Sequence, residues 1–195
     1  HAQGKVLLGS ELPPAGSVNL REIRSRCADS KNSDACDRLL QSSHGPSIMS
    51  IEELRYNDRE ALARLRLPDP LKSSKNGYAL HPSLMNGAVL GSVLTSLLHD
   101  TAYGLSIPFA LARMQLYGNP GPLPEELYAH VKPPADPPSS SNRSRRHDID
   151  LMDNAGNLLV SMKGFTTMPL APAKPPVIHA TPRLEPSPLK IPPKG

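Results

Sequence analysis

One long apolar stretch dominates the pattern of hydrophobic and polar positions. Between Leu84 and Leu98 nearly every residue is apolar or small, and His81-Pro82 stands just before this stretch. A proline at the first helical position loses only an amide that would be unpaired anyway, so a helix is predicted to begin there, with His81 fixing its start. Apolar residues surround most of the helix circumference, which predicts a buried helix. Asn86 would then be a polar group in an apolar wall, and its amide would need partners or a ligand.

Segments on both sides of this helix predict strands. Asn57-Asp58 is a turn pair between two of them, which predicts a hairpin. Short surface helices are expected at Asn19–Arg26 and Ser33–Gln41, with Ser33 as a candidate cap of the second. One long helix with antiparallel strands before and after it predicts an α+β fold, a sheet wrapped round a helix. The expected strands are Ile48–Tyr56, Arg59–Leu67 (Ala61, Ala63, Leu65 and Leu67 alternating with Leu62, Arg64 and Arg66), Leu105–Tyr117, Glu126–Lys132, Arg145–Asp153 and Asn157–Pro169, the last two joined through Asp153-Asn154-Ala155-Gly156.

Composition excludes several classes of function. Residues 171–195 hold four Lys or Arg and one Glu, a charge of +3, which leaves about +1 of the total +4 for residues 1–170. This nearly neutral body, with two Phe and five Tyr scattered along the chain, argues against nucleic-acid binding. No apolar run approaches the roughly 20 residues of a membrane span, and no signal peptide is recognised, so we expect a cytoplasmic protein. Cys27 and Cys36 have neither CxxC spacing nor neighbouring His, which favours reduced thiols over a metal site.

Proline and glycine mark the connecting segments. Leu7–Ser17 contains Pro13, Pro14 and Gly16 and is expected to be a linker. Pro133–Ser144 is expected to be a flexible loop, and the arginines around its end (Arg143, Arg145 and Arg146) either contact an acidic carrier protein or form a solvated strand end. Ala171–Gly195 is rich in proline and lacks an apolar period, which predicts an extended linker toward a following domain.

Four segments resemble the dehydratase domains of modular polyketide synthases, in the same order. HPSLMNGAVL at residues 81–90 is similar to the HPxLLDxxxQ element, and GPSIMSIEEL at 45–54 to YGPxFQGL. LSIPFALARMQLYG at 105–118 is similar to LPFxxxxVxLxG, and HDIDLMDNAGNLLVSMKGFTTMPL at 147–170 to YDVxLxDxxGxxVxxxxGLxxRPL. HAQGKV at 1–6 resembles the HAxGxV strand that ends the first hot dog of this family's double-hot-dog domain. The resemblance implies that residues 1–17 are the end of the first hot dog and a linker, 18–170 the second hot dog, and 171–195 an interdomain linker.

The same resemblance assigns candidate site residues. Asn86 stands where the family has its acidic Asp, which protonates the leaving hydroxyl. An amide does not release a proton at any accessible pH, so dehydration should be severely slowed. Leu90, one turn after Asn86, replaces the family's Gln or His, and Pro82 begins the helix that carries both. His44 replaces the Tyr of YGPxF and is either a pocket residue or a loop histidine. The family's catalytic His lies in an HxxxGxxxxP motif that this chain lacks, and His1 is not assigned to it. The base is therefore expected upstream.

Three functions stay open at this point. The Asp replacement resembles that of enoyl isomerases, or double-bond-shifting domains, of trans-acyltransferase synthases, which move an α,β double bond to the β,γ position with one His base. A dehydratase or pyran-forming cyclase is an enzymatic alternative, and a catalytically inactive scaffold domain is the third. The resemblance implies no bound cofactor, a substrate carried on the phosphopantetheine of an acyl carrier protein, the first hot-dog half as an intramolecular partner, and a homodimeric module.

Overall fold

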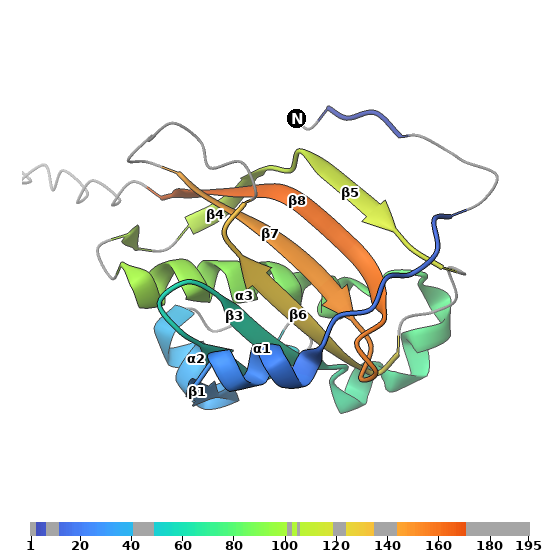
Figure 1. Ribbon diagram of the computed structural model, residues 1–195, viewed down its shortest axis with the longest axis horizontal. Coiled ribbons are helices and arrows are strands. Elements are labelled where there is room, and N and C mark those ends of the chain that lie inside the picture. Colours follow the sequence, from blue (N-terminus) through green and yellow to red (C-terminus); the bar gives the residue numbers. More distant parts are fainter. Residues whose placement is uncertain are drawn as a thin grey trace, which may run out of the picture.

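The computed structural model describes residues 3–6, 12–40, 49–100, 103–104, 106–118, 124–134 and 144–170. Within these ranges the strands form one antiparallel sheet in the order β1-β2-β3-β6-β7-β8-β4, and β5 also pairs with β8 (Figure 1). The strands are β1 Asp29–Asn32, β2 Ile51–Tyr56, β3 Ala61–Arg66, β4 Ser106–Ala110, β5 Arg113–Leu116, β6 Glu126–Lys132, β7 Arg145–Met152 and β8 Leu158–Pro169. The helices are α1 Leu20–Arg26, α2 Ser33–Leu40, the 3-10 helix η1 Asp69–Gly77 and α3 Pro82–His99.

Helix α3 packs against one face of the sheet and forms the main core. Alternate residues of β3 meet it, as the sequence predicts: Ala61, Ala63 and Leu65 are fully buried. Gly91 of α3 faces the sheet, and a β-carbon there would lie 3.6 Å from the side chains of Ala63 and Val131, in ordinary contact. The core also contains Cys36 and Leu40 of α2, Ile51, Leu54, Leu84, Ala88, Val93, Leu94, Leu127, Ala129, Ile149, Leu151, Val160 and Phe165.

Helix α1 covers the opposite face of the sheet, in front of the strands in Figure 1, with α3 behind them. A second apolar cluster joins Ile23 and Cys27 to Leu62, Tyr128 and Met152. Leu62 alternates with the core residues of β3 as predicted, but α1 buries it on the other face. Both cysteines are free and buried. Burial raises the pKa of each thiol to about 11, so they pack as small apolar side chains.

Several boundaries differ from those expected. The strand predicted at Leu105–Tyr117 is divided into β4 and β5, which pair with different parts of β8. Gly164 of β8 lies between these parts and has φ +62°, a conformation that favours glycine. The cap of α2 is Asn32 rather than Ser33, since Asn32 Oδ1 accepts from the backbone N–H of Ala35 at 3.0 Å. Strand β1 and helix η1 were not predicted.

The end of the predicted N-terminal linker lies along the hairpin of β7 and β8. Val18 N–H donates to Gly156 O at 2.8 Å, and Leu158 N–H donates to Gly16 O at 2.8 Å. Gly156 has φ +85° and a β-carbon there would overlap the carbonyl of Val18. This glycine therefore allows both the turn and the close approach. The predicted segments at 7–11, 135–143 and 171–195 lie outside the described residues, as does His44, and the domain division stays a prediction.

Candidate active site

The imidazole of His81 holds the beginning of α3. Its Nδ1 accepts from the backbone N–H of Ser83 at 3.2 Å, and its Nε2 lies 3.2 Å from the hydroxyl of Ser74 in η1. Nδ1 accepts only when it carries no proton, so Nε2 carries the proton in the neutral ring. Burial lowers the pKa of His81 and favours that neutral form. Both ring nitrogens are occupied, and His81 serves the helix start as the sequence predicts.

The first turns of α3 are held against the sheet by Ser50, just before β2. Ser50 is buried, and its hydroxyl donates to the backbone carbonyl of Ser83 at 2.8 Å. Gly87 lies one turn further along the same side of the helix, and a β-carbon there would overlap the Ser50 hydroxyl and come within 3.0 Å of Leu65 Cδ2. The helix backbone therefore sits closer to β2 and β3 here than a larger residue would permit.

The structure brings three of the predicted site residues together on α3. Pro82, Asn86 and Leu90 are four residues apart, so they follow one side of the helix, one turn after another. Pro82 is exposed, Asn86 is half-buried, and Leu90 is 8 % exposed and belongs to the main core. This side of the helix thus runs from solvent into the core, with the Asn86 amide between the two. The roles assigned to these residues stay predictions.

The helix is less enclosed than its sequence suggests. Met85, Asn86 and Val89 are half-buried rather than buried, and Pro82 is exposed. The expectation of a buried helix is therefore wrong for these residues in the N-terminal half of α3. The sheet of this chain covers one side of α3. The side with Pro82, Met85, Asn86 and Val89 is accessible within the described residues. An apolar partner covering it would explain why the residues there are apolar.

The electrostatic environment of Asn86 is neutral along its own helix. Helix α3 contains no Asp, Glu, Lys or Arg, and its one titratable side chain is His99 in the last turn. Thirteen residues of helix rise about 20 Å, which separates His99 from Asn86. The surroundings on α3 are thus apolar and uncharged, and the amide itself is neutral.

A row of exposed apolar side chains lies at β4 and β5. Phe109 is 68 % exposed, and Ile107, Leu111 and Met114 are also exposed. Strand β4 ends the sheet order and β5 runs along the same border beside β8 (Figure 1). An edge strand with exposed hydrophobic residues offers both unpaired backbone groups and apolar surface to another strand.

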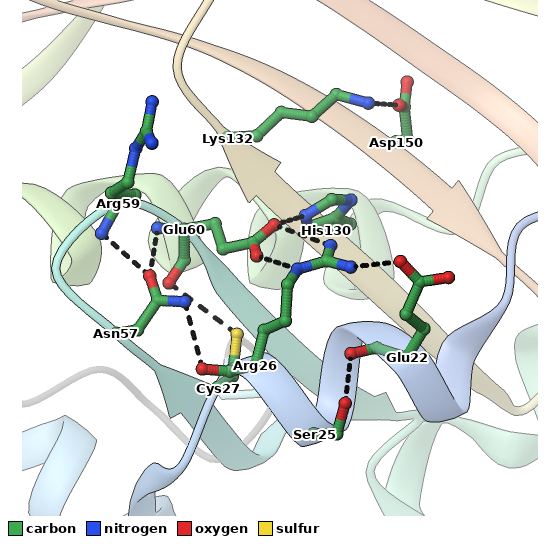
Figure 2. Close-up of polar contacts among 10 residues, drawn as sticks. All are labelled: Glu22, Ser25, Arg26, Cys27, Asn57, Arg59, Glu60, His130, Lys132 and Asp150. Atoms are coloured by element: carbon green, nitrogen blue, oxygen red, sulfur yellow. Dashed lines mark hydrogen bonds and ion pairs between the residues drawn. The ribbon is translucent and has the colours of Figure 1, made fainter.

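A polar cluster that the sequence did not indicate lies beside α1 (Figure 2). Glu60 accepts from Arg26 Nε at 2.6 Å, and its other carboxylate oxygen lies 2.6 Å from His130 Nε2. The hydrogen bond from Arg26 lowers the pKa of Glu60 to about 2, while burial lowers the pKa of His130. A neutral His130 donating to an ionised Glu60 fits both shifts. Seventy residues separate Glu60 and His130, and only the pairing of β3 with β6 brings them together.

Polar side chains of β6, β7 and β8 next to this cluster also pair with one another. Asp150 accepts from Lys132 Nζ at 2.6 Å and from Ser161 Oγ at 2.5 Å, and Lys163 lies between Asp150 and Asp148. Hydrogen bonds to its carboxylate lower the pKa of Asp150 against the opposing effect of burial. These groups are paired with one another, so the arrangement stabilises the sheet and offers no reactive group. Cys27, beside the cluster, keeps its thiol protonated at neutral pH.

The described residues also line a cleft away from Asn86. A cleft of about 250 Å³ opens at Ser50, Ile51, Arg66 and Leu67, and Asn86 is not among its lining residues. No group of three or more His, Cys, Asp or Glu side chains in this part of the chain is placed to hold a metal ion. Among the helices that the structure describes, none is both long and apolar enough to cross a membrane.

Comparisons with known proteins identify the relatives of this chain. A family described as "Polyketide synthase dehydratase N-terminal domain" matches residues 15–176. Polyketide synthase PksM of Bacillus subtilis (strain 168) is 32 % identical over 172 residues, covering 84 % of this chain and 4 % of PksM. Polyketide synthase PksN of the same strain is 29 % identical over 85 % of this chain and 3 % of PksN. The chain thus spans a small fraction of these relatives.

Solved structures confirm the predicted hot-dog fold. A trans-AT PKS dehydratase domain from Brevibacillus brevis has a TM-score of 0.73 and 29 % identity, covering 82 % of this chain and 55 % of that one. The dehydratase domain of the CurF module of the curacin polyketide synthase has a TM-score of 0.68 at 20 % identity, covering 83 % of this chain and 55 % of that chain. The matched share of each structure is about one half. Placement of this chain as the second half stays a prediction, since the family description names an N-terminal domain.

Proposed function

Because the chain belongs to the polyketide synthase dehydratase family, as the match over residues 15–176 shows, we propose that its domain is an enoyl isomerase of a modular polyketide synthase. The reaction moves the α,β double bond of an acyl thioester to the β,γ position. The acyl chain arrives on the phosphopantetheine of an acyl carrier protein, and the domain itself needs no cofactor. We place it in a cytoplasmic synthase with separate acyltransferases, because a 29 % identical structure is described as a trans-AT dehydratase domain.

The observation that carries the proposal is the amide of Asn86 on the uncharged helix α3. In a dehydratase the residue at this position must give a proton to the leaving hydroxyl. The amide cannot do so, and Leu90, one turn away, offers no polar contact and packs into the core. Loss of water is therefore disfavoured at this site, whereas a reaction that needs only one base is not.

Isomerisation balances with a single base. An imidazole removes the γ-proton of the α,β-unsaturated thioester, and the electron pair of the broken C–H bond becomes the new β,γ double bond. The former α,β pair moves toward the thioester carbonyl and gives a dienolate. The protonated imidazole then returns a proton to the α carbon, so no atom is gained or lost. A neutral amide opposes the developing negative charge less than an ionised carboxylate would.

The proposed base comes from a partner segment. Of the two histidines at the ends of α3, His81 has both ring nitrogens occupied at the helix start, and His99 lies in the last turn. We propose that the first hot-dog half supplies the imidazole and pairs with the exposed β4–β5 edge. The apolar side chains of that edge and the accessible side of α3 support this assignment, because both are surfaces that a partner would bury.

The test is hydrogen exchange in the intact domain. The domain is incubated in deuterated water with a 2-enoyl thioester on its carrier protein, and mass spectrometry and NMR follow label and double-bond position. We expect label at the α or γ carbon and the 3-enoyl product. Asn86→Ala should raise the barrier by about 1–3 kcal/mol if the amide positions substrate through a buried hydrogen bond. Replacement of the upstream His should abolish exchange.

Each alternative predicts a different result. A folded domain that binds its carrier protein but gives neither exchange nor isomer with several acyl chains would support the inactive scaffold. Rapid loss of water from a 3-hydroxyacyl carrier protein would instead identify a dehydratase. Either result would overturn the isomerase assignment.

A further inference from the structure

The turn of α3 that carries Asn86 is held from outside the helix at two points. Ser50 donates its hydroxyl to the Ser83 carbonyl at 2.8 Å, three residues before Asn86. Gly87, the residue after Asn86, packs its bare backbone against the same serine. Ser50 is 2 % exposed, so this contact is shielded from competing water.

From these contacts we propose that Ser50 is a positioning residue for Asn86, and that Ser50 and Gly87 are a size-matched pair that sets the place of this helical turn. The inference rests on the proposed function for its kinetic consequence only. Ser50 does not contact substrate in this proposal; it acts through the helix backbone.

Helix geometry explains why the contact reaches Asn86. Residues 83 and 87 are one turn apart and share a side of the helix, and each residue turns the helix by about 100°. Asn86 therefore projects to the side of the Ser50 contact, not into it. Any tilt or outward movement of the helix at this contact would carry the amide with it. Interiors are close-packed, so a small change of volume at the contact is transmitted rather than absorbed.

The glycine provides the sharper evidence. A β-carbon at Gly91, one turn later on α3, would make ordinary contacts of 3.6 Å, whereas one at Gly87 would overlap the Ser50 hydroxyl. Glycine inside a helix is normally unfavourable compared with alanine. Gly87→Ala and Gly91→Ala should therefore have different effects on the melting temperature. The first should lower the melting temperature and the second should leave it unchanged or raise it.

The pairing is tested by removing the serine side chain. In the background Ser50→Gly the overlap with the hydroxyl is absent and the 3.0 Å contact with Leu65 Cδ2 stays, so adding Gly87→Ala should lower the melting temperature much less than in the natural background. If Gly87→Ala behaves like Gly91→Ala in the natural background, or if Ser50→Gly does not reduce its effect, the size-matched pair is refuted.

The positioning role is tested by the side-chain amide signal of Asn86 in the complete domain, labelled with ¹⁵N-asparagine and assigned with Asn86→Asp. Ser50→Ala should move this signal. The matched control is Ser92→Ala, which removes another buried hydroxyl that donates to an α3 carbonyl, that of Val89, at 2.8 Å. Ser92 is six residues after Asn86, about 9 Å along the helix. Both variants should lower the melting temperature similarly, but only Ser50→Ala should displace the Asn86 signal.

Kinetics then separate this proposal from the proposed function. Ser50→Ala should lower the kcat of isomerisation by on the order of tenfold with little change in KM, below the hundredfold that a 1 Å misplacement can cost. Ser92→Ala should leave kcat unchanged. If the natural domain does not isomerise, the proposed function fails, and the amide signal still decides the role of Ser50. An unmoved Asn86 signal in Ser50→Ala, or an equal movement in Ser92→Ala, would overturn the positioning role.

Discussion

His147 should make the stability of this chain fall steeply in mild acid. It lies on β7 opposite Phe165 and is 8 % exposed. Its Nδ1 has no hydrogen-bond partner among the described residues. Burial lowers the pKa of His147 to about 4, with smaller contributions in the same direction from His99 and Arg145 and an opposing one from Asp148. The neutral ring is therefore the form that the folded state accepts.

The sign and size of the effect follow from linkage. An unfolded histidine has a pKa near 6.5, so between pH 6.5 and about 4 the unfolded chain binds a proton that the folded chain does not. Stability from His147 is complete above that window and is lost as the pH falls through it. Between pH 7 and pH 4 the loss is about 3 kcal/mol, a large fraction of the stability of an ordinary domain.

Urea unfolding of the natural chain and of His147→Phe at several pH values measures this contribution. Between pH 7 and pH 4, the free energy of unfolding should fall by about 3 kcal/mol less in the variant than in the natural chain. Carboxylates such as Glu60 contribute equally to the two proteins. His147→Leu serves as a second variant in case phenylalanine overpacks the site. His99→Gln is the matched control, because His99 is exposed and its removal should keep most of the pH dependence. An unchanged pH dependence in both His147 variants would refute the reasoning.

Three further predictions concern the helix, the site and the edge. His81→Ala should cost about 0.5–2 kcal/mol of stability in thermal unfolding, and His81→Asn should restore most of it because asparagine also caps helices. Asn86→Asp should give little dehydration of a 3-hydroxyacyl carrier protein by mass spectrometry, since Leu90 still lacks a polar group; a rate near that of an ordinary dehydratase would contradict this. In the complete domain, Phe109→Asp should lower the melting temperature, by a loss of roughly 1.5–3 kcal/mol of apolar burial, whereas Phe109→Leu, which keeps an apolar side chain at the same place, should lower it less. An equal effect of the two would show that the edge faces solvent.

Strong local signals in the sequence predicted much of the fold. Glu126–Lys132 has the predicted bounds, and Asn57 forms its turn by accepting from the backbone N–H groups of Arg59 and Glu60. In these segments alternation or turn chemistry acts over a few residues. The His81-Pro82 start of α3 is equally local, because capping and proline geometry require only the next turn.

The features that were missed depend on distant partners. Strand β1 is polar and mostly exposed, and only its pairing with β2 makes it a strand. Strands β4 and β5 pair with the two parts of β8 on either side of Gly164, some fifty residues later. The contact of Ser50 with α3 joins residues 33 apart, so no pattern in either segment indicates it. For the candidate site, the sequence and its family resemblance indicated Asn86 and Leu90, while the accessible side of α3 required the structure.

The accessible side of α3 bears directly on the choice between acid and amide. If a partner half covers Asn86 with apolar surface, a neutral amide there costs a few kcal/mol at most, and a hydrogen bond to substrate offsets it. An ionised carboxylate in the same place would be far more costly and would be protonated instead, which is the state that a dehydratase needs. Burial would therefore protonate an aspartate at this position and make it a proton donor. The same burial leaves asparagine unchanged, and its neutral amide can form a hydrogen bond beside the proposed dienolate. Covering the site thus creates an acid only when residue 86 carries a carboxyl group, and with Asn86 it supports chemistry that moves a proton and releases no water.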